Sequence, residues 1–409
     1  MNMDTSLLAL DTAEVVEVAR RALGSNTAHI VGWEVSPLSY DRTTPSSSGV
    51  YRVAGTAIEG GQCLQWSVVL KVLQSPAGMT MPNGAVIPHD LPDDPGLFGY
   101  WKREALAQEA GILRRLPGGV AAPRCYGVTA PVDGMLWLWQ EDVTEGDLCW
   151  NLEQYRLAAQ RLGRFNGAYL AGLTVPTYPW LAGGWLRSWL ALPATGMMAR
   201  IKQSHAWERP TVRRAFPASV AGRVDRLWQG QGTLLTALES LPQVLCHRDA
   251  FRPNLFIRSG RDGTDGVVAI DWAFVGPGPV GEEIAPLITM QPAGGKEGFA
   301  PWRLEAPVFD AYLQGLDDAG WRGDPNLVRF GYAASAALRY ILPTVTELSV
   351  DLCDERRWAE VEARRGMQFE RAVEQQVALT EFLLDLADEA TSLLKALAYS
   401  EREQRVAIS

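Results

Sequence analysis

The sequence predicts an α+β protein in which a small β-rich lobe precedes a larger, mostly helical lobe. Residues 29–73 are rich in Val, Trp and Tyr, and Gly60-Gly61 stands where a hairpin turn would join two strands. After about residue 140, apolar side chains recur mainly with the spacing of helices. We therefore divide the chain into an amino-terminal lobe of residues 1–140 and a carboxy-terminal lobe of residues 141–409.

The composition is that of a folded protein with room for one large core or two ordinary ones. Of 409 residues, 47% are hydrophobic and 21% are charged, which does not match the profile of a disordered chain. A formal charge of −9 and the lack of any Lys/Arg block argue against nucleic-acid binding. The uncharged run at residues 165–186 is broken by Pro176, Pro179 and four glycines, so we do not expect a membrane span.

The five cysteines indicate a reducing compartment. They are widely spaced and form no CxxC pair, so neither a disulfide framework nor a structural zinc site is predicted. The first residues also lack the basic leader of a secretory signal peptide. We expect a cytoplasmic protein.

In the amino-terminal lobe we expect two helices and a small antiparallel sheet. Asp11 and Glu14 form a capping-box pattern at the start of a short amphipathic helix that ends before Gly24. The other expected elements follow in order: strands at 51–58 and 63–72, a helix at 101–116, and strands at 121–128 and 135–139. Residues 75–98 are rich in proline and glycine and predict a long loop, which is either a lid over a ligand or a disordered insertion.

In the carboxy-terminal lobe one expected strand pair interrupts a series of helices. The pair is formed by residues 254–257 and 267–270, which Gly260-Arg261-Asp262-Gly263 connects. Helices are expected at residues 151–172, 218–240, 305–316, 326–342 and 355–397.

The residues with the clearest chemical pattern flank this strand pair. Asp249 precedes Asn254 by five residues, and Asp271 ends the apolar run after the hairpin. Phosphotransferases use this spacing to hold a catalytic base and two magnesium ligands. Asp249 is the candidate base, and Asn254 and Asp271 offer the hard oxygen ligands that Mg²⁺ prefers. We expect His247 to be structural and to hydrogen-bond the loop that presents Asp249.

A second group of candidates lies in the amino-terminal lobe. Val69 and Lys71 point to the same face of one strand, where Lys71 would hold the ATP phosphates and Val69 would cover the adenine ring. The alternative is an ordinary exposed lysine. A lysine beside phosphate is normally oriented by a carboxylate, for which Glu104 is preferred and Glu109 remains a competitor.

The loop that covers the phosphates is expected between the first two strands. The segment Thr43-Thr44-Pro45-Ser46-Ser47-Ser48-Gly49 lies there, and small hydroxyl residues such as Ser48 can bring donors to phosphate oxygens. The segment has a single glycine and no GxGxxG pattern, so a surface turn is an equal alternative.

These motifs resemble those of the aminoglycoside phosphotransferase and choline kinase superfamily, whose members are relatives of the protein kinases. The matching residues, within a resemblance that extends from Lys71 to about Leu287, are His247-Arg248-Asp249 with Asn254, Ile270-Asp271-Trp272, Gly276-Pro277 and Glu283-Ile284-Ala285. The chain departs from the family where it has Arg248 and Phe251, since a glycine is usual at the first position and a second histidine is common at the other.

The resemblance implies a two-lobed, protein-kinase-like fold and transfer of the γ-phosphoryl group of ATP, with Mg²⁺, to a hydroxyl of a small molecule. By position, Gln140 and Glu141 would lie in the hinge at about 137–143, where backbone groups meet the adenine. The acceptor stays open among an aminoglycoside or other antibiotic, an amino alcohol and a sugar, as do the choice of ATP or GTP and the oligomeric state. The alternative is a catalytically silent kinase-like protein that binds nucleotide.

Two features could contact an acceptor. Tryptophans of the helical lobe can stack on sugars or enclose a quaternary ammonium, although most are expected in the core; they are Trp180, Trp185, Trp189, Trp207 and Trp228. The acidic series Glu347, Asp351, Asp354 and Glu355 could bind the amines of an aminoglycoside, although a solvated helix face is the favoured interpretation.

Overall fold

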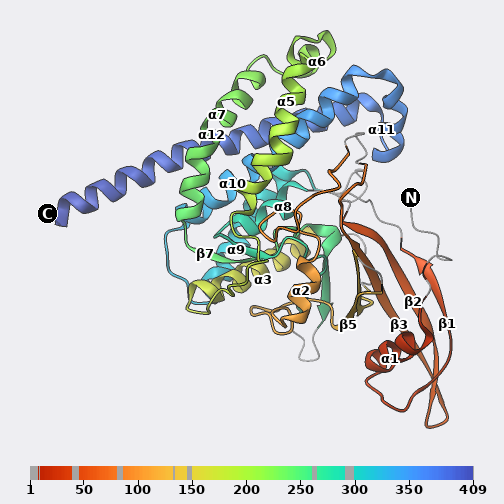
Figure 1. Ribbon diagram of the computed structural model, residues 1–409. Coiled ribbons are helices and arrows are strands. Elements are labelled where there is room, and N and C mark those ends of the chain that lie inside the picture. Colours follow the sequence, from red (N-terminus) through yellow and green to blue (C-terminus); the bar gives the residue numbers. More distant parts are fainter. Residues whose placement is uncertain are drawn as a thin grey trace.

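The computed structural model describes residues 8, 10–38, 46–80, 86–131, 134–144, 150–259, 265–290 and 299–408, with side chains as far as residue 398. It confirms the predicted fold class, since an antiparallel sheet precedes a mostly helical region (Figure 1). Within the part of the chain that is described, no helix is long and apolar enough to cross a membrane.

The amino-terminal sheet has five strands in the order β1-β2-β3-β6-β5, and every neighbouring pair is antiparallel. Its strands are β1 (His29–Pro37), β2 (Ser47–Glu59), β3 (Gln62–Gln74), β5 (Cys125–Thr129) and β6 (Met135–Glu141). Alternate residues of β2 and β3 are buried, which gives the sheet one apolar face. Helix α1 (Thr12–Leu23) packs against β3 and β5.

The cap of α1 differs from the predicted capping box. The Asp11 side chain accepts a hydrogen bond from the Ala13 amide at 3.0 Å, as an N-cap should. Glu14, however, does not reach back to the cap, because its carboxylate accepts from Thr129 Oγ1 at 2.7 Å and from Trp139 Nε1 at 2.8 Å. Glu14 therefore ties α1 to the sheet.

The region between β3 and β6 also differs from the prediction. The expected helix at 101–116 is the shorter α2 (Arg103–Glu109), and the expected strand at 121–128 is two strands in different sheets. Of these, β5 belongs to the five-stranded sheet, whereas β4 (Val120–Ala121) pairs in parallel with β9 (Asp265–Ala269) of the other lobe. Pro123 lies between them and explains the break, because proline cannot donate to a strand ladder.

The carboxy-terminal lobe is built around long helices. They are α3 (Leu152–Leu170), α7 (Val220–Ser240), α9 (Pro301–Asp318), α10 (Pro325–Cys353) and α12 (Phe369–Ile408), and the shorter ones are α4 (Trp185–Trp189), α5 (Thr195–Gln203), α6 (Pro210–Ala215), α8 (Ala285–Thr289) and α11 (Trp358–Arg365). The single helix expected at 355–397 is divided at Gly366, whose φ of +62° ends α11. Helix α10 is buried over most of its circumference and forms the centre of this lobe.

Close contacts between helices hold in place the strand that precedes His247. Gly163 and Gly315 let α3 and α9 approach, because a Cβ at either position would lie 2.2 Å from a carbonyl oxygen of the other helix. Nearby, Asn166 accepts from the Tyr312 hydroxyl at 2.6 Å and donates to the Leu245 carbonyl at 2.8 Å. Strand β7 (Gln243–Cys246), which contains Leu245, is thereby attached to the helices.

The chemical motifs lie next to the ends of the small strands of this lobe. As predicted, β8 (Leu255–Ser259) pairs with β9, but a second pair, formed by β7 and β10 (Gly276–Pro279), had not been expected. The sequence of β10 is Gly-Pro-Gly-Pro, a composition depleted in strands, so propensity gave no sign of it.

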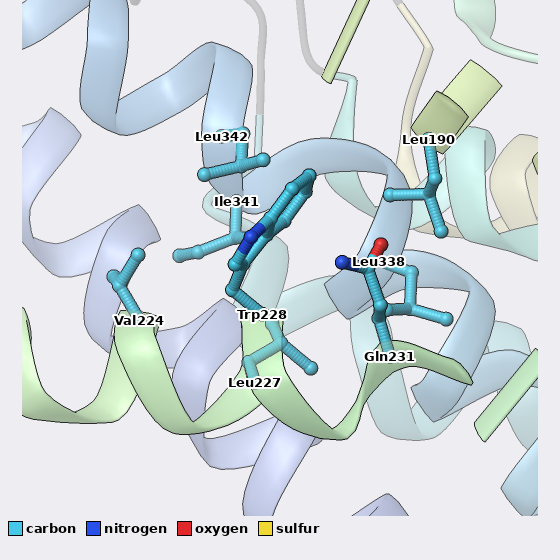
Figure 2. Close-up of a pocket in the computed structure, with 8 residues that line it drawn as sticks. All are labelled: Leu190, Val224, Leu227, Trp228, Gln231, Leu338, Ile341 and Leu342. Atoms are coloured by element: carbon cyan, nitrogen blue, oxygen red, sulfur yellow. The ribbon is translucent and has the colours of Figure 1, made fainter. Parts of the chain in front are cut away.

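A small apolar pocket marks the contact between α7 and α10 (Figure 2). Val224, Leu227 and Trp228 of α7 face Leu338, Ile341 and Leu342 of α10 across it. Its volume of about 10 Å³ is no more than a single water molecule needs, so we interpret it as a packing gap.

Candidate active site

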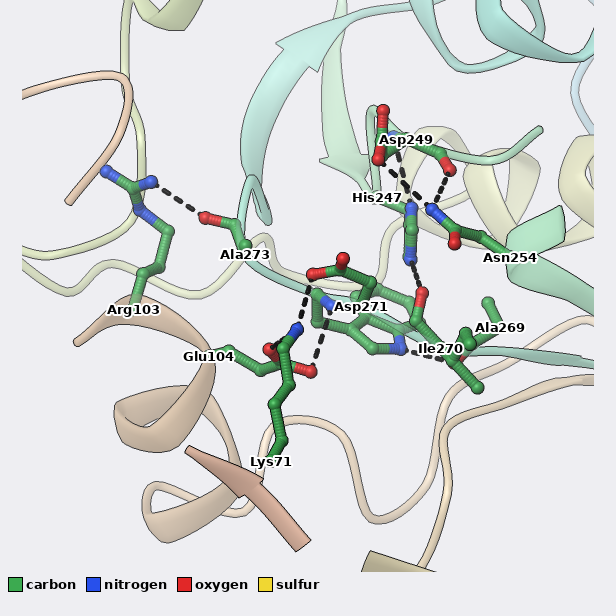
Figure 3. Close-up of polar contacts among 11 residues, drawn as sticks. Lys71, Arg103, Glu104, His247, Asp249, Asn254, Ala269, Ile270, Asp271 and Ala273 are labelled. Atoms are coloured by element: carbon green, nitrogen blue, oxygen red, sulfur yellow. Dashed lines mark hydrogen bonds and ion pairs between the residues drawn. The ribbon is translucent and has the colours of Figure 1, made fainter. Parts of the chain in front are cut away.

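Lys71 lies between two carboxylates (Figure 3). Its Nζ atom is 2.6 Å from Oε2 of Glu104 on α2 and 2.7 Å from Oδ1 of Asp271, which follows β9. The competing Glu109 is on the exposed side of α2, so Glu104 is the residue that contacts Lys71. Burial alone would lower the pKa of Lys71, but the charges of Asp271 and Glu104 outweigh it and raise the pKa above its ordinary value.

Asp271 is the open member of this cluster. Glu104 is buried and its second oxygen accepts from the Trp272 amide at 3.3 Å, whereas the Asp271 side chain is 41% exposed. The φ of Asp271 is +63°, in the left-handed region that residues other than glycine rarely adopt. Such strain is often found at functional sites, and here it turns the carboxylate toward Lys71.

His247 holds the loop that presents Asp249. Its Nε2 contacts the Ile270 carbonyl at 2.8 Å, and its Nδ1 accepts from the Asp249 amide at 3.1 Å. These contacts require a neutral ring protonated on Nε2. Burial lowers the pKa of His247 to about 4, which favours the same neutral form. The histidine is therefore placed as a structural link between the Asp249 loop and the segment that contains Asp271.

Asn254 is oriented by Asp249. Its Nδ2 donates to the backbone oxygen and to Oδ2 of Asp249, both at 3.0 Å. Only the nitrogen of the amide can serve both acceptors, so Oδ1 points away from them and is available to a cation. Among the described residues no cluster of three or more His, Cys, Asp or Glu could hold a metal ion. A cation here would need other oxygen ligands beside Asn254 and Asp271.

The sequence analysis missed Arg339, which contacts the candidate base. From α10 its Nη2 donates to Asp249 Oδ1 at 3.1 Å and its Nη1 donates to the Arg248 carbonyl. The guanidinium also lies 4.6 Å from the ring centre of Trp185 and 5.0 Å from that of Tyr340. Its position within the apolar run at residues 336–342 was a usable signal, because an arginine is rarely buried unless it is paired.

Asp249 has an environment that suits a proton acceptor. Burial raises its pKa to about 6, although the charge of Arg339 opposes this shift. The carboxyl group is thus ionised at neutral pH and has a pKa closer to neutrality than that of an exposed aspartate.

Arg248 occupies a backbone position that suits glycine. Its φ is +67°, which explains why glycine is usual here in the superfamily that the sequence resembles. The buried guanidinium donates to the carbonyls of Phe274 and Pro277 and to Glu282 at 3.3 Å. A Cβ at Gly276 would lie 2.9 Å from Nη1 of Arg248, so that glycine leaves the necessary space. Contacts with distant residues therefore hold Arg248 in a backbone conformation that a glycine would adopt without such contacts.

Arg103 fastens the long loop to the helical lobe. Its buried guanidinium donates to three carbonyls of the loop and to two from the other lobe; these belong to Pro95, Leu97, Phe98, Trp180 and Ala273. The Phe98 amide donates to Ser188 Oγ at 3.1 Å, and the Phe98 ring meets those of Trp185 and Trp189. The end of the predicted loop is thus packed against α4, while residues 81–85 lie outside the described part.

Two of the remaining nucleotide-site candidates lie along β2 and β3. Val69 is half-buried on β3 and pairs with Gln140 of β6. Ser48 is buried at the start of β2, within an irregularity where the register shifts between Ser47 and Gly49. The preceding residues 39–45, which include the first three residues of the expected phosphate loop, lie outside the described residues.

The predicted hinge residues are already engaged. The Glu141 amide donates to the Arg124 carbonyl at 2.8 Å, and the Glu141 carboxylate accepts from Arg258 at 2.8 Å. Gln140 is buried in the sheet, and its Nε2 has no hydrogen-bond partner among the residues that the structure describes. The next residue, Asp142, is held by Arg52 through bonds of 2.7 and 3.1 Å.

The two features considered for acceptor binding have other partners. In the acidic series, Glu347 and Asp351 pair with Arg364 and Arg357 at 2.8 Å, and Asp354 pairs with Arg356 at the same distance. These carboxylates are neutralised by arginine and offer little to an amine. Of the tryptophans, Trp185 is buried in the core, and the other four are partly buried against it.

Comparison with known proteins matches part of the chain to one family. A model of the phosphotransferase enzyme family matches residues 91–324, which is more than half of the chain. No curated protein sequence matches.

Solved structures similar to the chain share little of its sequence. An aminoglycoside 2'-phosphotransferase in complex with GDP is 12% identical, with 94% of this chain and 99% of that chain covered and a TM-score of 0.39. A spectinomycin phosphotransferase bound to AMP is 11% identical, with 92% and 98% covered and a TM-score of 0.44. An ethanolamine kinase from Plasmodium vivax is 12% identical, with 85% and 81% covered and a TM-score of 0.40.

Proposed function

The chain belongs to the phosphotransferase enzyme family, and we propose that it is a small-molecule kinase that moves the γ-phosphoryl group of ATP to a hydroxyl. The observation that supports this best is the contact of Lys71 with both Glu104 and Asp271, beside the Asp249–Asn254 pair. The cluster joins a strand of the sheet to the motif loops of the helical lobe, as a nucleotide site between two lobes requires. The acceptor would be an antibiotic, an amino alcohol or a sugar.

Each residue would have a separate role at bound ATP and Mg²⁺. Lys71, oriented by Glu104, would donate to phosphate oxygens in place of its present bond to Asp271. Asp271 and Asn254 would supply two oxygens to Mg²⁺, which completes its shell with phosphate oxygens and water. The metal would neutralise charge on the phosphates. Val69 would cover the adenine and Ser48 would face the phosphates. Backbone groups of the hinge at about 137–143, which includes Gln140 and Glu141, would meet the adenine edge.

Asp249 would accept the proton of the attacking hydroxyl. Its Oδ2 is held by Asn254 and its Oδ1 by Arg339, so the carboxylate is fixed in place before an acceptor arrives. General base catalysis of this kind typically contributes about 10²- to 10⁴-fold to the rate.

The decisive test is Mg²⁺-dependent turnover of ATP by wild type and by Asp249→Ala, with water and a panel of hydroxylated metabolites and antibiotics as acceptors. We expect Asp249→Ala to lower turnover about 10²- to 10⁴-fold while ATP still stabilises the fold. Asp225→Ala, which removes an exposed carboxylate of α7, is the matched control. Full activity of Asp249→Ala would refute the role of Asp249, and ATP binding by the wild type without any turnover would favour the catalytically silent alternative.

We also propose the compartment in which the protein acts and the boundary between its two lobes. The cysteines at 63, 125, 246 and 353 are free, which agrees with action in the reducing cytoplasm. The lobes would comprise residues 1–140 and 141–409, with the hinge at about 137–143.

A further inference from the structure

A cavity of about 530 Å³ lies away from the residues proposed for catalysis. Its walls come from the turn after α2, from α3 and from the hairpin of β8 and β9, and none of the candidate site residues lines it. The volume is in the range of small-molecule sites, about 300–1,000 Å³. Nothing in the proposed phosphoryl transfer uses this space.

Three arginines line the cavity and keep hydrogen-bonding capacity. Arg161 donates only through Nε, to the Asp265 carbonyl at 2.9 Å, so both of its terminal nitrogens lack a partner among the described residues. Arg164 binds Asp318 through Nε and Nη2, and Arg258 binds Glu141 through Nη2. Each of these two has at least one further nitrogen that no described residue occupies.

Two glycines of the turn after α2 line the same wall. Gly118 and Gly119 have φ values of +75° and +81°, and their amides make no hydrogen bond to any described residue. A Cβ at Gly118 would lie 2.3 Å from the Phe165 nitrogen, so a side chain is excluded there. Successive unpaired amides in a turn form a concave site for anions.

We propose that this cavity is a second ligand site and that it binds the phosphate group of an anionic small molecule. The guanidinium of Arg161 and the amides of Gly118 and Gly119 would donate to the phosphate oxygens, and Arg164 and Arg258 would complete the positive wall. Asp265 also lines the cavity, and its carboxylate would accept from a hydroxyl of the ligand. The chemistry therefore suits a phosphate ester of a hydroxylated compound.

The site touches segments that lead to the catalytic cluster. Arg258 holds Glu141 at the end of β6, and β9 runs from the cavity to Asp271. A ligand bound through the other nitrogens of Arg258 would share this guanidinium with Glu141 of the predicted hinge.

The test is calorimetric titration of the full chain with pyrophosphate at constant ionic strength and without Mg²⁺. We expect saturable binding that Arg161→Gln weakens about 10-fold or more, as the loss of a charge-assisted pair should. Arg156→Gln changes an exposed arginine of the same helix outside the cavity and should leave the affinity unchanged. Lys71→Met removes the cation that would bind phosphate at the catalytic cluster, so it should abolish any pyrophosphate binding there and leave the binding that depends on Arg161.

Two outcomes would overturn the proposal: the absence of saturable binding, or an affinity that Lys71→Met lowers and Arg161→Gln does not. A second measurement needs no variant and tests the proposal even if Arg161→Gln folds poorly. When pyrophosphate is added, hydrogen exchange of the backbone amides at residues 118–121 should slow. Neither readout depends on ATP turnover, so failure here is distinct from failure of the proposed function.

Discussion

At the scale of single residues, the charge on Asp249 results from a balance between burial and Arg339. Burial raises the pKa of the carboxyl to about 6, and the guanidinium 3.1 Å away restrains that rise. A base must be ionised, so kcat/KM for Mg²⁺-dependent turnover should fall about 10-fold for each pH unit below 6 and level off above it.

Replacing Arg339 should move this pH limb in a defined direction. Arg339→Gln removes the charge that lowers the pKa of Asp249, so the apparent pKa should rise and activity at pH 6 should fall more than activity at pH 8. Arg339→Lys keeps the positive charge, so the apparent pKa should return part of the way to its wild-type value. A pH profile from 4.5 to 8.5 checks this, and equal losses at every pH would mean that Arg339 acts only through the fold.

Lys71 allows its roles in stability and in nucleotide binding to be separated. Lys71→Met leaves the buried Glu104 without its cation, which should cost about 3–5 kcal/mol of unfolding free energy. Adding Glu104→Gln removes the unpaired charge and should recover most of that loss in urea denaturation. The double variant should still lack stabilisation by Mg²⁺-ATP. Recovery of nucleotide binding along with stability would contradict the phosphate-binding role of Lys71.

At the scale of elements, Arg103 connects the carboxy-terminal end of the long loop, α2 and the segment after Asp271. Its five carbonyl partners come from both lobes, and burial lowers its pKa to about 9, still high enough for a charged group at neutral pH. Arg103→Leu should cost at least about 3 kcal/mol, because several hydrogen bonds to a charged donor are lost at once.

The same variant should loosen one segment more than the rest. Hydrogen exchange of Arg103→Leu should rise most at residues 95–98, which lose three of the carbonyl contacts. Lys102→Leu removes a neighbouring exposed ion pair with Asp93 and is the control. If exchange at residues 95–98 stays unchanged in Arg103→Leu, the loop is held by Phe98 and its aromatic neighbours instead.

Elements and motifs differed in how far the sequence could predict them. Asp249, Asn254 and Asp271 could be predicted from the sequence as site residues, because they lie within one short stretch whose spacing has a chemical meaning. Glu104 could only be preferred over Glu109, since the choice depends on which face of α2 meets Lys71. Arg339 and Arg103 act through contacts with residues distant in the chain, and β10 forms despite its Gly-Pro composition because β7 lies beside it. The sequence pattern around each of these residues does not indicate which distant residues it will contact.

At the scale of the whole molecule, the proposed site is assembled from both lobes, so nucleotide binding should stabilise the chain as a unit. Lys71 and Glu104 come from the amino-terminal lobe, whereas Asp271 and Asn254 belong to the other. A ligand that binds only the folded chain raises the free energy of unfolding by about 2.7 kcal/mol when its concentration is 100 times its Kd.

Thermal unfolding with saturating Mg²⁺-ATP should therefore show one transition at a higher temperature. EDTA should remove most of the increase, and Asp271→Ala should remove it with Mg²⁺ present, because Asp271 is the proposed metal ligand. An increase that is the same with EDTA, or in Asp271→Ala, would show that nucleotide binds without the proposed cation site.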